Sequence, residues 1–155
     1  MIRPATPADA PALAALWNPW ITDTVVTFSA TPKTATNLQD LILNRPVFLT
    51  TDSLQGFATY TQFRGGDGYV TCMEHSLILA PTARGQGLGR ALLLAIEQHA
   101  AAHGAHQMIA GITAENPAAV AFHACMGYAH TARIRDAGYK FGRFIDLLLM
   151  QKFLS

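Results

Sequence analysis

The sequence is poor in charge. Only 14% of its 155 residues are Asp, Glu, Lys or Arg, and the formal net charge is +1. Such a balance gives no electrostatic field that would hold a nucleic acid or an anionic membrane. No apolar run reaches the roughly 20 residues that a membrane span requires, and the first residues lack the long apolar stretch of a signal peptide. We therefore expect a cytoplasmic protein that has no nucleic-acid or membrane partner.

Cysteines and clusters of metal ligands are scarce as well. The two cysteines, Cys72 and Cys125, form no Cys-x-x-Cys pair, which fits free thiols in a reducing compartment. His99 and His103 are four residues apart on one predicted helix face, with His106 beyond them. No carboxylate or cysteine completes a metal-ligand set there, so we expect no metal.

Half of the residues are apolar, enough for the core of a single domain that spans residues 1–155. Strands are predicted at residues 2–5, 47–51, 56–63, 69–79, 108–112, 128–134 and 144–150, and helices at 6–20, 36–44, 91–103 and 116–126. Residues 24–28 fit either a strand or an extended loop, and residues 64–68 fit a turn. No repeat or linker interrupts this order, which predicts a mixed α/β fold.

Three glycines crowd the segment between the long fourth strand and the helix that follows it. Gly85, Gly87 and Gly89 allow a close approach to the backbone. The first N–H groups of a helix lack partners, and the helix dipole adds about half a positive charge there. The segment therefore predicts a site for a pyrophosphate. It is not a P-loop, since no Gly-Lys-Ser/Thr follows, and it does not match the Gly-x-Gly-x-x-Gly dinucleotide motif.

The spacing Arg84-x-x-Gly87-x-Gly89 resembles the pyrophosphate loop of the GCN5-related N-acetyltransferase (GNAT) superfamily. Four segments follow the order of its phosphinothricin acetyltransferase-like branch: IRPATPADAPALAALWN, EHSLILAPTARGQGLGRALL, ENPAAVAFHACMGY and GYKFGRFIDLLLMQ. The resemblance covers nearly the whole chain. It implies a GNAT fold, in which a central mixed, mostly antiparallel sheet with a splayed parallel pair is flanked by helices. It also implies acetyl-CoA as co-substrate.

By this resemblance, the arm of acetyl-CoA lies in the gap between the splayed strands. The implied cofactor-binding residues are Leu77, Ile78, Leu79, Arg84, Gly85, Gln86, Gly87, Leu88, Gly89, Arg90 and Asn116. Asn116, which precedes Pro117, also fits a helix N-cap, and the two roles are compatible. A backbone N–H of Ile78 or Leu79 would stabilise the oxyanion of the reaction.

Acetyl transfer to an amine requires a group that removes a proton. Glu74 lies in an otherwise apolar predicted strand, and because an unpaired charge in the core is costly, its carboxylate is expected to face a cleft. The resemblance implies that Glu74 is the base, the alternative being a salt-bridged or solvent-facing residue. His75 would point to the opposite face and fits a packed histidine. His123 stands where many GNAT enzymes have a tyrosine that protonates the thiolate, so it is either an acid or a positioning group.

An amino-acid-like acceptor carries a carboxylate, for which an arginine is a natural partner. The implied substrate-binding residues are Phe28, Phe63, Arg64, Tyr139 and Lys140. Val70 stands where the branch commonly has an arginine. The sequence does not choose among phosphinothricin, methionine sulfoximine and related methionine derivatives.

The function predicted is thus direct transfer of acetyl from acetyl-CoA to the α-amine of a small amino-acid-like molecule. A protein or peptide N-acetyltransferase and a non-catalytic CoA-binding domain are the alternatives. Cys125 is interpreted as a packed residue rather than an acyl-carrying nucleophile. Because the branch often places its acceptor pocket near a subunit interface, a homodimer is expected.

Overall fold

Seven strands form one sheet in the order β1-β2-β3-β4-β5-β7-β6, in a computed structural model that describes all 155 residues. The strands are β1 (Ile2–Pro4), β2 (Phe48–Thr51), β3 (Gly56–Gln62), β4 (Cys72–Leu79), β5 (Gln107–Thr113), β6 (Ala129–Lys140) and β7 (Arg143–Phe153). Every neighbouring pair is antiparallel except β4 and β5, which are parallel. The predicted mixed, mostly antiparallel sheet is confirmed.

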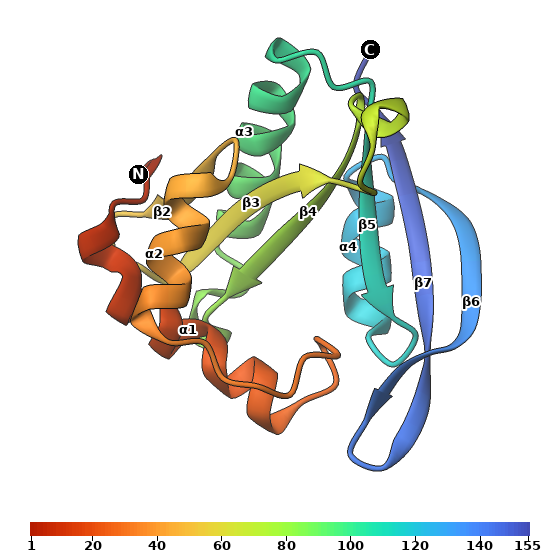
Figure 1. Cartoon of the computed structure of the whole chain (residues 1–155), viewed down its shortest axis with the longest axis horizontal. Helices are drawn as coiled ribbons and strands as arrows, with labels where there is room; N and C mark the ends of the chain where they lie inside the picture. Colours follow the sequence, from red (N-terminus) through yellow and green to blue (C-terminus); the bar gives the residue numbers. More distant parts are fainter.

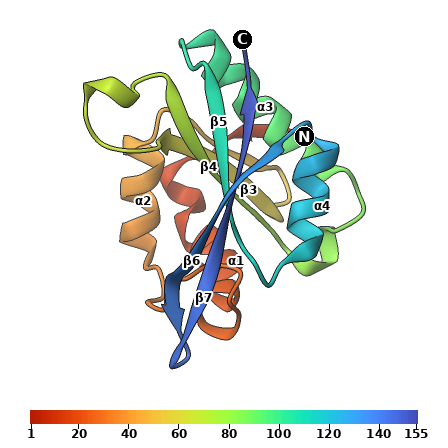
Figure 2. The ribbon, with the colours of Figure 1, turned by 90° about the vertical axis from the view of Figure 1, so that its right-hand side faces the viewer.

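Helices cover both faces of this sheet (Figures 1 and 2). One face carries α1 (Ala10–Asp23) and α2 (Ala35–Asn44), and the other carries α3 (Leu88–Ala102) and α4 (Pro117–Cys125). The larger core lies under α3 and α4 and includes Leu92, Leu93, Ile96, Tyr60 and Met108, all of them buried. A smaller core lies under α1 and α2 and includes Leu13, Leu38 and Phe57. None of the helices combines the length and apolarity needed to cross a bilayer.

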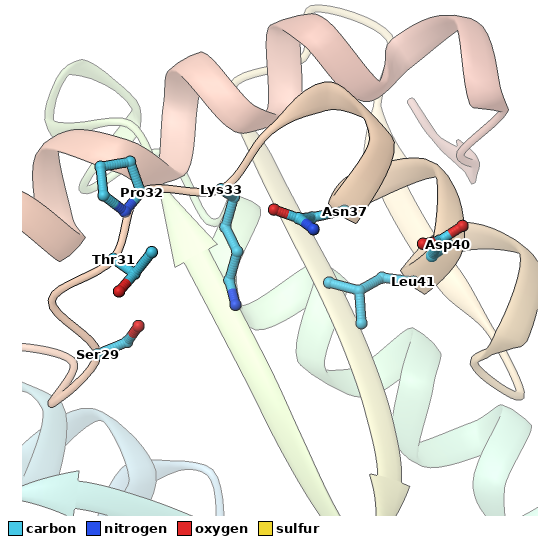
Figure 3. A pocket seen from close by; sticks show the side chains of 7 residues that line it. All are labelled: Ser29, Thr31, Pro32, Lys33, Asn37, Asp40 and Leu41. Carbon is cyan, nitrogen blue, oxygen red and sulfur yellow. The ribbon is translucent and has the colours of Figure 1, made fainter.

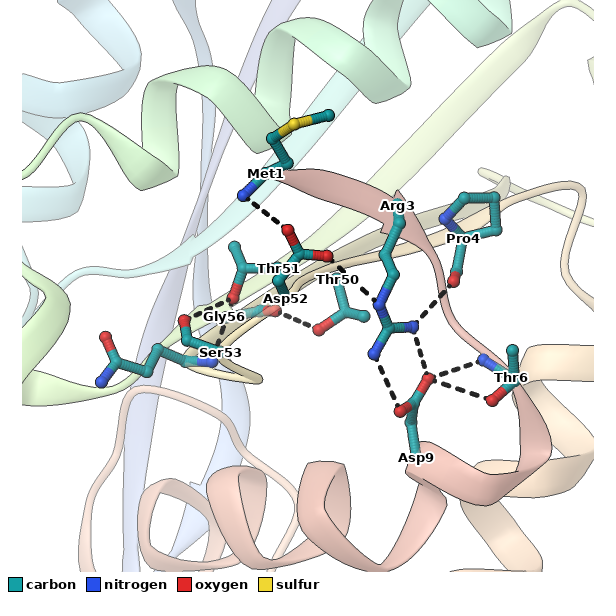
Figure 4. Close-up of polar contacts among 11 residues, drawn as sticks. Met1, Arg3, Pro4, Thr6, Asp9, Thr50, Thr51, Asp52, Ser53 and Gly56 are labelled. Carbon is teal, nitrogen blue, oxygen red and sulfur yellow. Dashed lines mark hydrogen bonds and ion pairs between the residues drawn. The ribbon is translucent and has the colours of Figure 1, made fainter.

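The first strand and the first helix are joined by a polar network (Figure 4). The Arg3 guanidinium donates to both carboxylate oxygens of Asp9, at 2.8 and 3.0 Å, and these hydrogen bonds lower the pKa of Asp9 to about 2. We predicted Thr6 as the N-cap of this helix. Thr6 is the N-cap of a short 3-10 turn, Pro7–Asp9, that leads into α1, rather than of α1 itself, and its hydroxyl contacts the Asp9 carboxylate at 3.2 Å.

The hairpin of β6 and β7 is longer than the sequence pattern indicates. We predicted strands at residues 128–134 and 144–150 and none in residues 135–143. The ladder continues through them with a shift of register, and Asp136 has a φ of 55°. Asp146 holds this irregular stretch, since its carboxylate accepts from the Asp136 N–H at 2.9 Å and from Arg133 at 2.7 Å.

Candidate active site

The candidate site arises where β4 leaves β5. The two strands pair at three positions only, from Cys72–Gln107 to Glu74–Ile109, and then diverge (Figure 1). The sequence pattern started β4 at Tyr69, but Asp67–Tyr69 form a 3-10 turn and the strand begins at Cys72. Although β4 is the fourth of seven strands, all of its residues are partly exposed. A central strand with a free edge leaves a slot in the sheet.

The free edge of β4 presents the backbone groups of alternate residues. In the antiparallel pair with β3, the Phe63 N–H donates to the Cys72 carbonyl at 2.9 Å, and the Ala80 N–H donates to the Gln55 carbonyl at 2.8 Å. Even-numbered residues of β4 therefore bond to β3, and the backbone groups of odd-numbered residues face β5. Beyond the last β4–β5 pair, those groups face the slot.

Leu77 and Leu79 are the odd-numbered residues of β4 that face the slot. The Trp20 indole N–H already donates to the Leu79 carbonyl at 3.1 Å, which leaves the Leu79 N–H and both groups of Leu77. Ile78 lies opposite Phe57 and turns its backbone groups toward β3. Of the residues proposed from the sequence for backbone contacts, the geometry thus brings Leu77 and Leu79 to the slot and turns the Ile78 backbone away from it.

A cavity of about 670 Å³ lies along the slot and is lined by residues from both sides of β4. All of the cofactor-binding residues implied by the sequence line it except Gln86, whose side chain donates to the Thr82 carbonyl at 3.0 Å. The lining also includes residues that the sequence analysis did not identify, namely Trp17, Trp20, Gly111 and Phe122. The two tryptophans lie three positions apart on α1, a spacing that fits a core face equally well, so the sequence carried no signal for their place in a cleft.

The glycine loop closes one end of this cavity. Gly85 and Gly87 have φ angles of 75° and 77°, and a β-carbon at either position would meet no atom within 4 Å. Glycine is needed at these two positions because the backbone is left-handed there, and not because a larger side chain would clash with the rest of the protein. Gly89 differs, because a β-carbon there would lie 3.0 Å from Leu79 Cδ1 and would separate α3 from β4.

The start of α3 offers unpaired N–H groups at the loop. Ala91 is the first residue of the helix whose N–H bonds within it, to the Gly87 carbonyl at 3.0 Å, and no side chain caps the helix. Arg84 and Arg90 flank these N–H groups and form no salt bridge. Arg84 lies over the Trp20 ring at 5.3 Å from its centroid. Arg90 donates to the Met126 sulfur at 3.7 Å, but no carboxylate neutralises either guanidinium group. Helix N–H groups beside two such guanidinium groups form a site for an anion with several charges.

The opposite wall of the cavity comes from α4. Asn116 caps this helix, since its side-chain oxygen accepts from the Ala119 N–H at 3.1 Å, as the sequence predicts. His123 lines the cavity about two helical turns further on. Its Nε2 lies 3.0 Å from His75 Nε2, and its Nδ1 lies 2.7 Å from the Ala119 carbonyl. His75 points away from the face of Glu74, as predicted, but it lines the cavity and is not only a packed residue.

Glu74 lies at the last pair before β4 and β5 diverge. It shares the α1/α2 face of the sheet with Ile78, which packs against the core under those helices. Burial raises the pKa of Glu74, and the positive charge of Arg45 at the end of α2 opposes this rise. Glu74 does not line the cavity itself, but its Oε2 would be 3.0 Å from a β-carbon at Gly111, a residue that does. Because Gly111 has no side chain, the Glu74 carboxylate has room to lie beside the cavity.

Of the five implied substrate-binding residues, only Phe28 lines the cavity. Its ring lies against the backbone of β6, where a β-carbon at Gly138 would be 2.6 Å away. Lys140 is buried and donates to the Ile21 and Thr27 carbonyls at 2.5 and 2.7 Å. Its ammonium therefore fixes the backbone next to Phe28 and does not face the cavity.

The other three residues lie outside this cavity. Phe63 is partly exposed in the segment after β3. Arg64 is exposed and lies over the ring of Tyr69, 5.6 Å from its centroid. Tyr139 is 62% exposed on the β6–β7 hairpin and packs against Phe144. The chain by itself thus does not bring these three side chains to the slot.

A second, smaller pocket of about 340 Å³ lies between the segment before α2 and the helix itself (Figure 3). It contains none of the residues implied by the sequence, and its lining is mostly polar and exposed. Lys33 at its edge lies over the Trp17 ring, 5.1 Å from the centroid.

No cluster of three His, Cys, Asp or Glu residues is arranged to hold a metal ion. His99 and His103 stack on α3 with ring centroids 4.0 Å apart, and the Nδ1 of His99 contacts the Tyr60 hydroxyl at 2.8 Å. Cys125 is exposed at the end of α4 and does not line the cavity. The prediction that Cys125 is a packed residue is therefore wrong.

The known proteins that resemble this chain in sequence or in structure are acetyltransferases. Residues 15–128 match the acetyltransferase (GNAT) family. An L-methionine sulfoximine/L-methionine sulfone acetyltransferase of Pseudomonas aeruginosa is 33% identical, over 97% of this chain and 92% of its own. A crystal structure of ribosomal-protein-alanine N-acetyltransferase from Brucella melitensis has a TM-score of 0.94 at 36% identity, with 99% of both chains covered. A phosphinothricin acetyltransferase from Sinorhizobium meliloti in complex with acetyl-CoA has a TM-score of 0.92 at 27% identity, over 100% of this chain and 88% of its own.

Proposed function

Because this chain belongs to the acetyltransferase (GNAT) family, we propose that it moves the acetyl group of acetyl-CoA to the α-amine of a small amino-acid-like acceptor. The observation that carries the proposal is the slot beside β4, which has unpaired backbone groups along its edge and an anion site at its end. The acceptor class follows the Pseudomonas relative, whose name gives methionine sulfoximine and methionine sulfone as substrates.

The residues of the slot fit acetyl-CoA, which supplies an activated acetyl thioester. The N–H groups at the start of α3, with Arg84 and Arg90, would hold its phosphates. The free N–H and carbonyl groups of Leu77 and the N–H of Leu79 match the amide groups of its arm, in the manner of an added strand. A side chain at Gly87 would project into the space that the phosphates need, since nothing of the protein fills it.

Glu74 is the base in this proposal. An amine with a pKa well above 7 must lose a proton before it attacks, and a carboxylate whose pKa is raised by burial is better matched to that task than an exposed one. Glu74 lies on the α1/α2 face beside Gly111, whereas the anion site belongs to the α3 side. The acceptor would therefore enter from the α1/α2 face, and Glu74 would remove the ammonium proton directly or through a water.

Trp17 and Phe28 form the acceptor end of the cavity in this arrangement. Trp17 packs edge-on against Phe57 on the α1/α2 face, and its buried indole N–H has no hydrogen-bond partner in the protein. A carboxylate or sulfoxide oxygen of the acceptor would supply one. Arg64 does not line the cavity of its own chain. We propose that the single GNAT domain forms a homodimer and that Arg64 reaches the acceptor of the second subunit. Sedimentation of a monomer at micromolar concentration would exclude that role for Arg64.

A second candidate acceptor is the N-terminal alanine of a protein. The Brucella structure with 36% identity carries that activity in its name. Both acceptors present an α-amine, so the same slot and base would serve either. They differ beyond the α-carbon, because a peptide continues its chain there and a free amino acid ends in a carboxylate.

The deciding experiment measures release of free thiol from acetyl-CoA with a panel of acceptors. The panel contains phosphinothricin, methionine sulfoximine, methionine sulfone, free amino acids and peptides that begin with alanine. We expect saturable release with the methionine derivatives. Faster release with the peptides would establish the second candidate, and tight binding of acetyl-CoA without release by any acceptor would indicate a non-catalytic CoA-binding domain.

A further inference from the structure

Two buried side-chain polar atoms in the protein have no hydrogen-bond partner, Trp17 Nε1 and His75 Nδ1. Both residues line the 670 Å³ cavity. A buried polar atom without a partner is costly, and when several occur in one cavity a ligand is the natural source of the missing partners. Trp17 Nε1 can only donate. The partner that His75 Nδ1 requires depends on which of its ring nitrogens carries the proton.

The neighbours of His75 settle that question. His123 Nδ1 lies 2.7 Å from the Ala119 carbonyl, which can only accept, so His123 Nδ1 carries a hydrogen. Burial lowers the pKa of His123, and with a neutral ring its Nε2 is a bare acceptor. His75 Nε2 lies 3.0 Å from that atom and must therefore donate to it. A neutral His75 that carries its hydrogen on Nε2 has a lone pair on Nδ1.

Both rings are held in these states. They are nearly parallel, at an interplanar angle of 9°, and the Tyr128 ring meets each of them edge-on. Burial, with a smaller contribution from His123, lowers the pKa of His75 to about 3, so this ring stays neutral at physiological pH. His123 then has no free N–H for the cavity, because one nitrogen donates to Ala119 and the other accepts from His75. The polar atom of the pair that has no partner is His75 Nδ1.

The position of His75 indicates which part of a ligand it meets. Its side chain lies on the α3/α4 side of β4, like Leu77 and Leu79, and that is the side of the anion site. It follows the last β4–β5 pair directly, at the closed end of the slot. Four residues of strand, or about 13 Å, separate it from Leu79 near the glycine loop. An arm whose phosphates are held at the loop would reach His75 with its sulfur end.

We propose that His75 Nδ1 accepts a hydrogen bond from the thiol of CoA, and that His123 is a positioning residue that fixes the His75 tautomer. The inference rests on the proposed placement of the cofactor in the slot. A thioester sulfur has no hydrogen, so the contact forms only in the product. As the C–S bond breaks, sulfur keeps the electron pair and receives the second proton lost by the amine, the first having gone to Glu74. His75 takes no proton.

Calorimetry with CoA and with desulfo-CoA, in which hydrogen replaces the thiol, tests the proposal without any acceptor. We expect the wild type to bind CoA about three- to tenfold more tightly than desulfo-CoA, the worth of one hydrogen bond. In His75→Gln, the amide replaces Nε2 but not Nδ1, and the ratio should fall to about one. In His75→Asn, whose side-chain oxygen lies near the former Nδ1, part of the preference should return. An unchanged ratio in His75→Gln would overturn the proposal.

Nitrogen NMR of the wild type gives a second readout that does not depend on a folded variant. The Nδ1 signal of His75 should be that of an unprotonated nitrogen, and it should shift upfield when CoA is added but not with desulfo-CoA. A protonated Nδ1, or equal shifts with both compounds, would refute the proposal. If Gly87→Ala left the affinity for acetyl-CoA unchanged, the placement of the cofactor would be at fault instead.

Discussion

Alanine substitutions at Gly87 and at Gly104 together distinguish two effects: the loss of stability from a strained backbone and the loss of affinity for acetyl-CoA. Gly87 has a φ of 77° and open space beside it, and Gly104 at the other end of α3 has a φ of 91° and is equally unobstructed. Alanine at either position must adopt a left-handed backbone, which costs about 1–2 kcal/mol. For a chain of this size we expect Gly87→Ala and Gly104→Ala to lower the melting temperature by a similar amount, about 2–8 °C.

The affinity for acetyl-CoA should differ sharply between the two variants. The methyl group of Gly87→Ala would project beside the free N–H groups of α3 and keep a phosphate from them. Loss of one charge-assisted hydrogen bond is worth about 1.5–3 kcal/mol, so calorimetry should show a dissociation constant raised about ten- to a hundredfold. Gly104→Ala should bind like the wild type. Equal affinities in the two variants would refute the placement of the phosphates at this loop.

Three further outcomes are expected. Glu74→Gln should lower turnover by about 10²–10⁴-fold with little change in acetyl-CoA affinity, and a wild-type rate would remove Glu74 from the proton transfer. Lys140→Met should lower stability by about 2–3 kcal/mol in urea unfolding, because the buried Ile21 carbonyl and the partly buried Thr27 carbonyl lose their donor. It should also raise the KM of the acceptor by loosening Phe28, and an unchanged stability would contradict the two hydrogen bonds. The pKa of Asp9 is lowered on folding, so its contribution is complete above about pH 4 and is lost as the pH falls through about 2. Acid unfolding of Asp9→Asn should lack that component, and identical acid transitions in both proteins would argue against the Arg3 pairing.

The sequence allowed the order of elements to be predicted because its helix signals and its turns are local. Asn116-Pro117 at the start of α4 illustrates this, since cap and proline act within one turn. The hairpin extension could not be predicted in the same way. Its irregular stretch is held by Asp146, ten residues away along the chain from Asp136, and no local pattern reports such a contact.

In the candidate site, too, local features could be predicted from the sequence and long-range contacts could not. The glycine loop was found because three glycines crowded within a few residues before a helix form a local pattern. The left-handed backbone of Gly85 and Gly87 was seen only in the structure. Lys140 was assigned to the substrate from its place in the tail, but its ammonium is used by carbonyls more than a hundred residues away. Trp17 and His75 were missed as ligand contacts, because an aromatic residue on a helix and a histidine in a strand both fit a core. Only the fold shows that their polar atoms lack partners.

The slot is thus defined by interactions that the protein leaves unmade. The edge of β4 lacks a partner beyond Glu74, the start of α3 lacks a cap, and the two unsatisfied buried side-chain atoms belong to residues that line the same cavity. Each of these costs stability in the free protein. A fold under selection for stability alone would lengthen the β4–β5 ladder and fill the gap. Because a single ligand with phosphates, amides and a sulfur at its tip would satisfy the N–H groups of α3, the edge of β4 and His75 in that order, the unmade interactions together identify the ligand more strongly than any one of them.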